Sequence, residues 1–132
     1  MKIIAPSMLS CNFGKLKEEI EMVNQSEAGW FHLDIMDGVF VPNITFGTPI
    51  LEVFKEYATK HLDAHLMIVN PENYIEKFAS LGANTITVHY EACDNLLNTI
   101  NQIKKLNVKA GVAINPDTDV SVLYSLINEI DL

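Results

Sequence analysis

Residues 30–68 read WFHLDIMDGVFVPNITFGTPILEVFKEYATKHLDAHLMI and contain two short apolar runs with a helical pattern between them. The apolar runs are residues 30–36 and 61–68, and each has the length of a strand. The helical pattern covers residues 49–57, where Pro49 suits the first turn of a helix. A strand, a helix and a second strand in this order are typical of a right-handed βαβ unit with parallel strands.

The same alternation extends in both directions along the chain. No glycine-rich dinucleotide fingerprint follows the first expected strand, which disfavours a nucleotide-binding doubly wound fold. Periodicity alone leaves a closed barrel and an open parallel sheet as alternatives. The further elements that the pattern predicts are strands at residues 2–7, 85–89 and 108–114, helices at residues 13–24, 70–81, 94–106 and 120–128, and the start of a sixth strand at residues 130–132.

The composition is that of a globular domain. Of 132 residues, 48% are hydrophobic, and nine Lys+Arg against seventeen Asp+Glu give a net charge of −8. This balance argues against a nucleic acid partner, but backbone N–H groups can still bind a small phosphorylated substrate. No apolar stretch approaches the roughly 20 residues needed to span a membrane, and the N-terminal apolar run is too short for a signal peptide. A cytoplasmic location is therefore expected.

Polar residues stand in segments where buried parallel strands are normally apolar. His32 and Asp34 share one face of their strand because residues i and i+2 point the same way, and His65 stands in the next strand. Two imidazoles and a carboxylate can give three ligands to a divalent metal ion. A lone buried histidine is more often structural, whereas a buried Asp34 needs a partner such as a cation. The spacing leaves a metal or acid–base site and a structural role as open alternatives.

Three neighbouring residues have simpler interpretations from their positions alone. Met36 and Met67 each stand two residues beyond a candidate ligand, and methionine most often fills gaps in a core. Asp63 is interpreted as a structural partner or a surface carboxylate. None of the three is assigned a chemical role by spacing.

Several segments of the chain form a specific pattern: APSMLS at 5–10, HLDIMDGVFVPNITFG at 32–47, DAHLM at 63–67, Asn70-Pro71, TVHYE at 87–91 and KAGVAINP at 109–116. Together these segments resemble ribulose-phosphate 3-epimerases. The resemblance runs in order through essentially the whole chain and is most specific at residues 32–43. The resemblance implies an α/β fold, the (β/α)8 TIM barrel, of which residues 1–132 cover about the first five βα units as a single incomplete domain.

The resemblance also implies an activity. These enzymes interconvert D-ribulose 5-phosphate and D-xylulose 5-phosphate in the pentose phosphate pathway, by metal-dependent proton abstraction at C3 through an enediolate intermediate. A homo-oligomer, a small sugar-phosphate ligand and one of the divalent cations of zinc, iron, manganese or cobalt are implied with it. Neither a nucleic acid nor a membrane is an expected partner.

Family roles fall on six residues of this chain. Asp34 falls on one of two catalytic aspartates, in addition to its place among the metal ligands. The metal ligands fall on His32, Asp34 and His65, the substrate contacts on Ser7 and again His65, and the methionines that border the reaction centre on Met36 and Met67.

The family pattern includes parts that these 132 residues do not contain. The second catalytic aspartate, which is also the fourth metal ligand, and the phosphate-binding loops belong to later strands. Residues 1–132 alone are therefore expected to be inactive. Two alternatives stay open: a sister epimerase acting on D-allulose 6-phosphate, which residues 43–47 disfavour, and a catalytically inactive truncated fragment.

Overall fold

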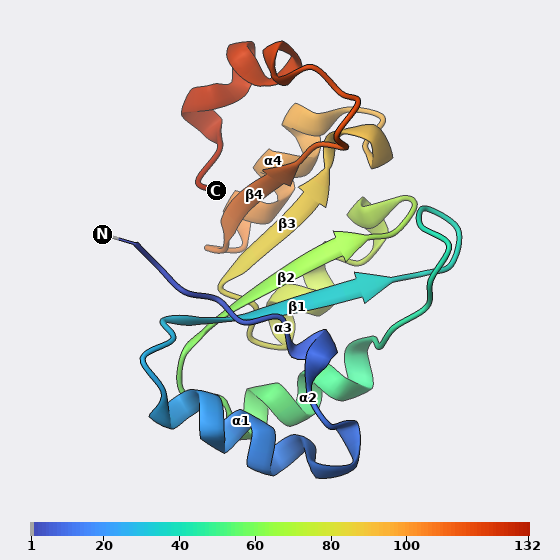
Figure 1. Cartoon of the computed structure of the whole chain (residues 1–132). Coiled ribbons are helices and arrows are strands. Elements are labelled where there is room, and N and C mark those ends of the chain that lie inside the picture. Colours follow the sequence, from blue (N-terminus) through green and yellow to red (C-terminus); the bar gives the residue numbers. More distant parts are fainter. Residues whose placement is uncertain (1) are drawn as a thin grey trace.

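The computed structural model describes residues 2–132, and its central feature is a four-stranded parallel sheet in the order β1-β2-β3-β4. The four strands point the same way, so their C-terminal ends lie along one side of the molecule (Figure 1). The α/β class is confirmed, and each strand agrees with its predicted range to within one residue at either end. The strands are β1 (Trp30–Met36), β2 (His61–Met67), β3 (Thr85–His89) and β4 (Lys109–Ala113).

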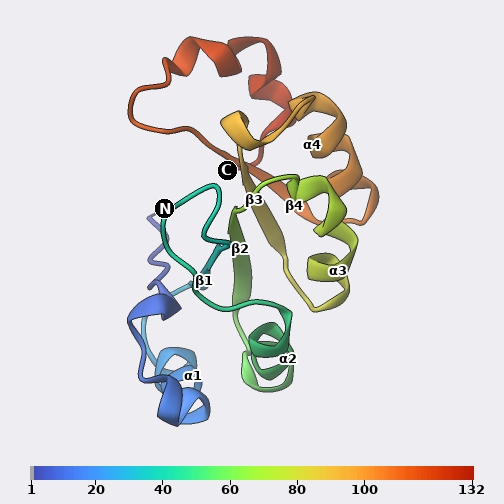
Figure 2. The same cartoon turned by 90° about the vertical axis from the view of Figure 1, so that its right-hand side faces the viewer.

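Four helices cover the outer, convex side of the curved sheet (Figure 2). Two of the predicted helices begin with separate 3-10 turns, η2 and η3, instead of one continuous α-helix. The α-helices are α1 (Leu16–Gln25), α2 (Thr48–Tyr57), α3 (Ile75–Ser80) and α4 (Leu96–Lys105), and the 3-10 segments are η1 (Met8–Ser10), η2 (Phe13–Lys15), η3 (Pro71–Asn73), η4 (Tyr90–Ala92) and η5 (Val120–Glu129).

The hydrophobic core lies between the sheet and these helices. In β1 every second residue is buried, and these residues are Phe31, Leu33 and Ile35. Phe31 packs edge-on against Phe54 of α2, with ring centroids 5.6 Å apart. Because side chains alternate along a strand, the intervening residues of β1 project from the opposite, inner face of the sheet.

The prediction of a strand at residues 2–7 is wrong. The segment lies along the edge of β1, where His32 N donates to Pro6 O at 3.0 Å and Ser7 forms an isolated parallel bridge with His32. Pro6 has no N–H group, so it cannot take part in a continuous hydrogen-bond ladder. The segment therefore follows the sheet without becoming a strand of it.

The last two predicted elements also differ from the structure. The helix expected at residues 120–128 is the 3-10 helix η5, in which only Leu123 is buried, so little packing favours a regular α-helix. Residues 130–132 are not a strand, although Asp131 N donates to Ala110 O of β4 at 2.8 Å. The Asp131 carboxylate accepts from Ala110 N at 2.9 Å, which takes a donor that a ladder would use.

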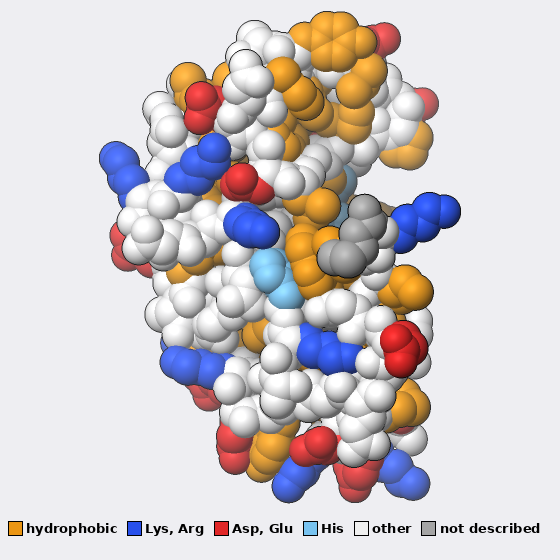
Figure 3. All heavy atoms as spheres, turned by 90° about the vertical axis from the view of Figure 1, so that its left-hand side faces the viewer, with side chains coloured by type: hydrophobic (Ala, Val, Ile, Leu, Met, Phe, Trp, Pro, Cys, Tyr) orange, Lys and Arg blue, Asp and Glu red, His pale blue; other side chains and the backbone are white. Residues whose placement is uncertain are grey.

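The side of the molecule at which the strands begin has a mixed surface. Lysine side chains and acidic side chains are interspersed over it, with apolar side chains between them (Figure 3). The polar groups described next lie instead on the inner face of the sheet.

Candidate metal centre

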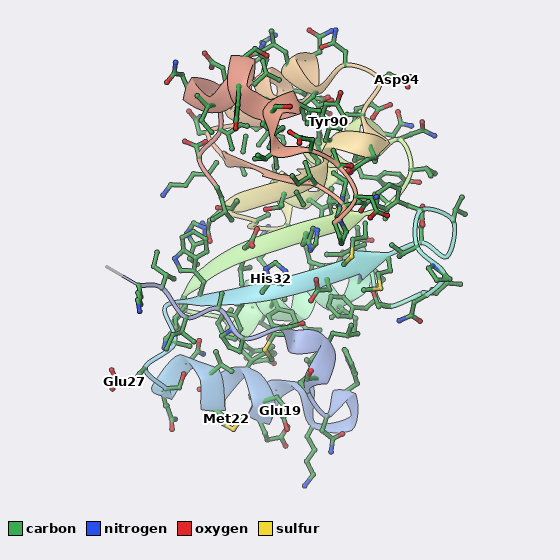
Figure 4. All side chains as sticks on the ribbon, turned by 45° about the horizontal axis from the view of Figure 1, so that its top comes forward. Glu19, Met22, Glu27, His32, Tyr90 and Asp94 are labelled. Atoms are coloured by element: carbon green, nitrogen blue, oxygen red, sulfur yellow. The ribbon has the colours of Figure 1, made fainter. Side chains whose placement is uncertain are left out.

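The register of the sheet brings the three candidate ligands together. Asp34 of β1 is the Cα partner of His65 of β2, and His32 is the partner of Asp63. The prediction that His32 and Asp34 share a face is therefore confirmed, and His65 lies beside them. Figure 4 shows His32 near the middle of the length of β1, whereas Glu19 lies on α1 at the periphery.

The donor atoms of this group face one another. Asp34 Oδ1 lies 3.2 Å from His32 Nε2 and 3.2 Å from His65 Nδ1. One ligand atom from each residue can be chosen so that all three lie within 4.8 Å of one another. Ligands about 2.1 Å from a tetrahedral ion stand roughly 3.4 Å apart. Two imidazole nitrogens and a carboxylate oxygen at these separations could hold a divalent transition metal ion.

The second carboxylate oxygen of Asp34 has a different partner. Ser7 Oγ donates a hydrogen bond to Asp34 Oδ2. Thr45, in the loop after β1, donates from Oγ1 to the backbone oxygen of Asp34 at 2.6 Å and accepts from Met36 N at 3.0 Å. The side chain and the backbone of Asp34 are thus both held from outside its own strand.

The pKa values of His32 and Asp34 are shifted by the hydrogen bonds within this cluster. Hydrogen bonds with Asp34 and Asp63 raise the pKa of His32 to about 10. Burial raises the pKa of Asp34, but hydrogen bonds from His32, His65 and Ser7 outweigh it and hold that pKa well below its ordinary value. Two carboxylates therefore converge on His32, and their joint preference for positive charge suits a cation at this place.

A further layer of polar residues surrounds the candidate ligands. Asp63 is only 2% exposed, and its Oδ2 lies 2.7 Å from His32 Nδ1. On the other side, His65 Nε2 lies 2.9 Å from Nε2 of the buried His89, at the end of β3. Asp63 is thus the structural partner that was one of its two predicted interpretations. His89 stands among the polar residues at strand ends in the sequence, but no role is predicted for it from that position.

The two methionines lie one step further along the strands than Asp34 and His65. Met36 and Met67 are Cα partners at the C-terminal ends of β1 and β2, and both are half-buried. A cavity of about 450 Å³ adjoins Met36, and it is lined by the loop after β1 together with Tyr74 and Phe78. None of the three candidate ligands lines this cavity.

Comparison with known proteins gives one consistent result. The model of the ribulose-phosphate 3 epimerase family matches residues 3–132. The chain is 46% identical to the ribulose-phosphate 3-epimerases of Synechocystis sp. over 132 residues and of Bacillus subtilis over 129 residues. It is 42% identical over 132 residues to the chloroplastic ribulose-5-phosphate-3-epimerase of Arabidopsis thaliana.

These alignments cover nearly all of this chain but only part of each relative. They include 98% of the chain, against 57%, 59% and 47% of the three relatives in the same order. The chain thus spans about half the length of the curated relatives it matches. No helix within residues 2–132 is long and apolar enough to cross a membrane. The family has the TIM-barrel fold, with which the four parallel strands and outer helices agree. The chain belongs to the ribulose-phosphate 3-epimerase family.

Proposed function

We propose that the protein epimerises C3 of a sugar phosphate and thereby interconverts D-ribulose 5-phosphate and D-xylulose 5-phosphate. The observation that carries the proposal is the convergence of His32, Asp34 and His65 on the inner face of the sheet, in a chain of this family. Barrel enzymes place their active sites at the C-terminal ends of their strands, and these three residues come from β1 and β2. The names of the relatives support the choice of substrate.

Epimerisation next to a ketone requires removal of a proton from one face of the carbon and delivery of a proton to the other. A bound divalent ion supplies stabilisation of the negative charge that develops on the substrate oxygens of the enediolate. In this proposal His32 Nε2, Asp34 Oδ1 and His65 Nδ1 hold the ion, because these are the atoms that face one another. His65 also contacts the substrate.

Asp34 has the properties of a proton acceptor on one face of the substrate. Its lowered pKa keeps the carboxylate ionised at neutral pH. We assign proton transfer to Oδ2, because Oδ1 is directed at the two imidazoles, whereas Oδ2 meets only the exchangeable hydroxyl of Ser7 among its described partners. Ser7 orients this oxygen and contacts the substrate.

The methionines complete the proposed reaction centre. Met36 and Met67 lie side by side in the register, at the strand ends just beyond Asp34 and His65. A thioether is polarizable and carries no acidic proton, so it can border a planar enediolate without protonating it. This property favours stereochemical control by the carboxylates alone.

The remaining parts of the proposal concern the metal, the assembly and the location. The donor set suits zinc, iron, manganese or cobalt. Residues 1–132 are proposed to be part of one barrel domain of a homo-oligomeric cytoplasmic enzyme, on the strength of the family resemblance. The net charge of −8 supports the absence of nucleic acid among its partners.

The test is an assay of the whole purified protein with D-ribulose 5-phosphate in D2O. We expect formation of D-xylulose 5-phosphate with deuterium at C3, loss of this activity after chelation of the metal, and its return when one of the four metals is added back. D-allulose 6-phosphate serves as the competing substrate. No turnover by the metal-loaded protein, or faster turnover of the six-carbon substrate, would contradict the proposal.

A further inference from the structure

The inner face of the sheet contains a line of contacts that reaches from β4 to the candidate ligand on β1. We infer that Gly111, Thr87 and Asp63 together position the imidazole of His32 for the metal ion, with Asp63 as the positioning residue that contacts it. This inference rests on the proposed metal site and adds residues to it from two further strands.

The first contact joins His32 to Asp63. The Nδ1 atom of His32 lies 2.7 Å from Asp63 Oδ2, while the Nε2 atom lies 3.2 Å from Asp34 Oδ1. A carboxylate can only accept from Nδ1–H of a neutral ring, so the lone pair of such a ring lies on Nε2, where the ligand atoms converge. Carboxylates that bind the second nitrogen of a metal-ligating histidine fix both its tautomer and its ring orientation.

The second contact orients the carboxylate itself. Asp63 is buried, so both of its oxygens need partners, and Thr87 Oγ1 of β3 donates to Asp63 Oδ1 at 2.9 Å. Thr87 is also buried, at 7% exposure, so water cannot readily take its place. With one oxygen held by β3, the other is directed at His32 on β1.

The third contact explains why β4 has a glycine at the position opposite Thr87. Gly111 is the Cα partner of Thr87. A Cβ atom at position 111 would stand 2.2 Å from Thr87 Oγ1 and 3.0 Å from Thr87 Cβ. Any side chain there would displace the threonine hydroxyl that holds Asp63, so a residue without a polar side chain takes part in positioning the metal ligand.

Four variants and one matched control test the role of these contacts. The measured quantity is the affinity of the whole protein for Co²⁺, determined by titration against a competing chelator. Loss of a residue that orients a metal ligand typically weakens binding about 10–100-fold, and we expect this of Asp63→Ala. Asp63→Asn should lose less, because its amide oxygen still accepts from the histidine. Thr87→Val and Gly111→Ala should each weaken binding several-fold, the second by adding a methyl group without removing any polar atom.

Thr85→Val is the control for Thr87→Val. Thr85 is a fully buried threonine of the same strand, but its hydroxyl lies 2.7 Å from His61 Nε2, at the other end of β2 from the ligands. We expect wild-type affinity for Co²⁺ in this variant, and similar melting temperatures for the two metal-free valine variants. A difference in affinity at equal melting temperature separates positioning from general stability.

A second readout follows the ring directly. In the Co²⁺-loaded protein the Nδ1–H proton of His32 should give a shifted NMR signal that exchanges slowly with solvent, and Asp63→Ala should lose that signal to exchange. Suppose that Asp63→Ala, Thr87→Val and Gly111→Ala all keep the wild-type affinity for Co²⁺ and that the His32 signal is retained. This result would overturn the positioning inference but not the proposed metal site. Failure of the unaltered protein to bind Co²⁺ would instead overturn the proposed metal site, and this inference with it.

Discussion

The hydroxyl of Ser7 donates a hydrogen bond to Asp34 Oδ2, the carboxylate oxygen that is not directed at the two imidazoles. Ser7 also forms the isolated bridge by which the N-terminal segment meets β1 at His32. The docking of that segment on the sheet and the orientation of the carboxylate are therefore coupled. In the proposed mechanism, Asp34 Oδ1 binds the metal ion and Oδ2 accepts the substrate proton.

Ser7→Ala should lower kcat/KM for epimerisation by about tenfold or more, because a hydrogen bond to a charged group contributes about 1.5–3 kcal/mol. The pKa of Asp34 should rise but stay below neutrality, since the imidazole partners remain. The measurement is the steady-state rate at neutral pH, with Ser10→Ala, an exposed serine of the adjoining turn, as control. Equal rates for the two variants would remove Ser7 from the reaction centre.

Asp34→Asn should abolish epimerisation while leaving the fold nearly intact. An amide cannot accept the substrate proton at neutral pH, and loss of general-base catalysis costs about 10²–10⁴-fold. Weakened metal binding should add to this loss. The measurements are the epimerisation rate and the circular dichroism spectrum, and retention of most of the activity would assign Asp34 a structural role.

We expect the unaltered protein to carry one divalent ion per subunit, and His65→Ala should remove most of this metal. Elemental analysis of the purified protein measures this, with His32→Ala and Asp34→Ala expected to behave alike. His61→Ala is the matched control, because His61 is on the same strand but stacks on Trp30, with ring centroids 4.0 Å apart. Unchanged metal content in His65→Ala would exclude that residue as a ligand.

The ionised Asp37 carboxylate should make the free energy of unfolding depend on pH in the acidic range. Slight burial raises its pKa, but hydrogen bonds from the backbone N–H groups of Val69, Val39 and Phe40 outweigh it, so the pKa is lowered in the folded state. Such a group stabilises the fold above its unfolded-state pKa of about 3.9, and this contribution is lost as the pH falls through the lower folded-state value.

Asp37→Asn removes this contribution at neutral pH and keeps a neutral acceptor at the same place. The unaltered protein should therefore be more stable than the variant at pH 7, and the margin should shrink as the pH falls toward 3. Urea unfolding of both proteins across this range measures the margin. A margin that is constant or grows toward acid would show that the Asp37 charge does not stabilise the loop.

The sequence predicts the candidate ligands better than the contacts that hold them. His32 and Asp34 are placed on one face by strand geometry alone, and the βαβ pattern places His65 on the neighbouring strand. The contact between Thr87 and Gly111 depends on the register between β3 and β4, which the connecting helix and loops set together. No local pattern contains that information.

The errors at the two ends of the chain have local causes. The segment before β1 has the apolar character of a strand, but Pro6 removes a donor that a ladder needs. At the other end, the Asp131 carboxylate takes the N–H of Ala110 that a neighbouring strand would use. In both places a single side chain overrides the hydrophobic pattern from which the prediction was made.

Because apolar and polar side chains alternate along β1, burial of its apolar residues also fixes the face on which the candidate ligands lie. If β1 slipped by one residue against β2, His32 and Asp34 would turn into the layer beneath the helices, and Phe31 and Leu33 would turn out of it. Exposure of each such apolar side chain costs about 1.5–3 kcal/mol, more than a typical single hydrogen bond contributes. The loss of apolar burial therefore destabilises the shifted register, and this selection of the correct register does not require a bound metal ion.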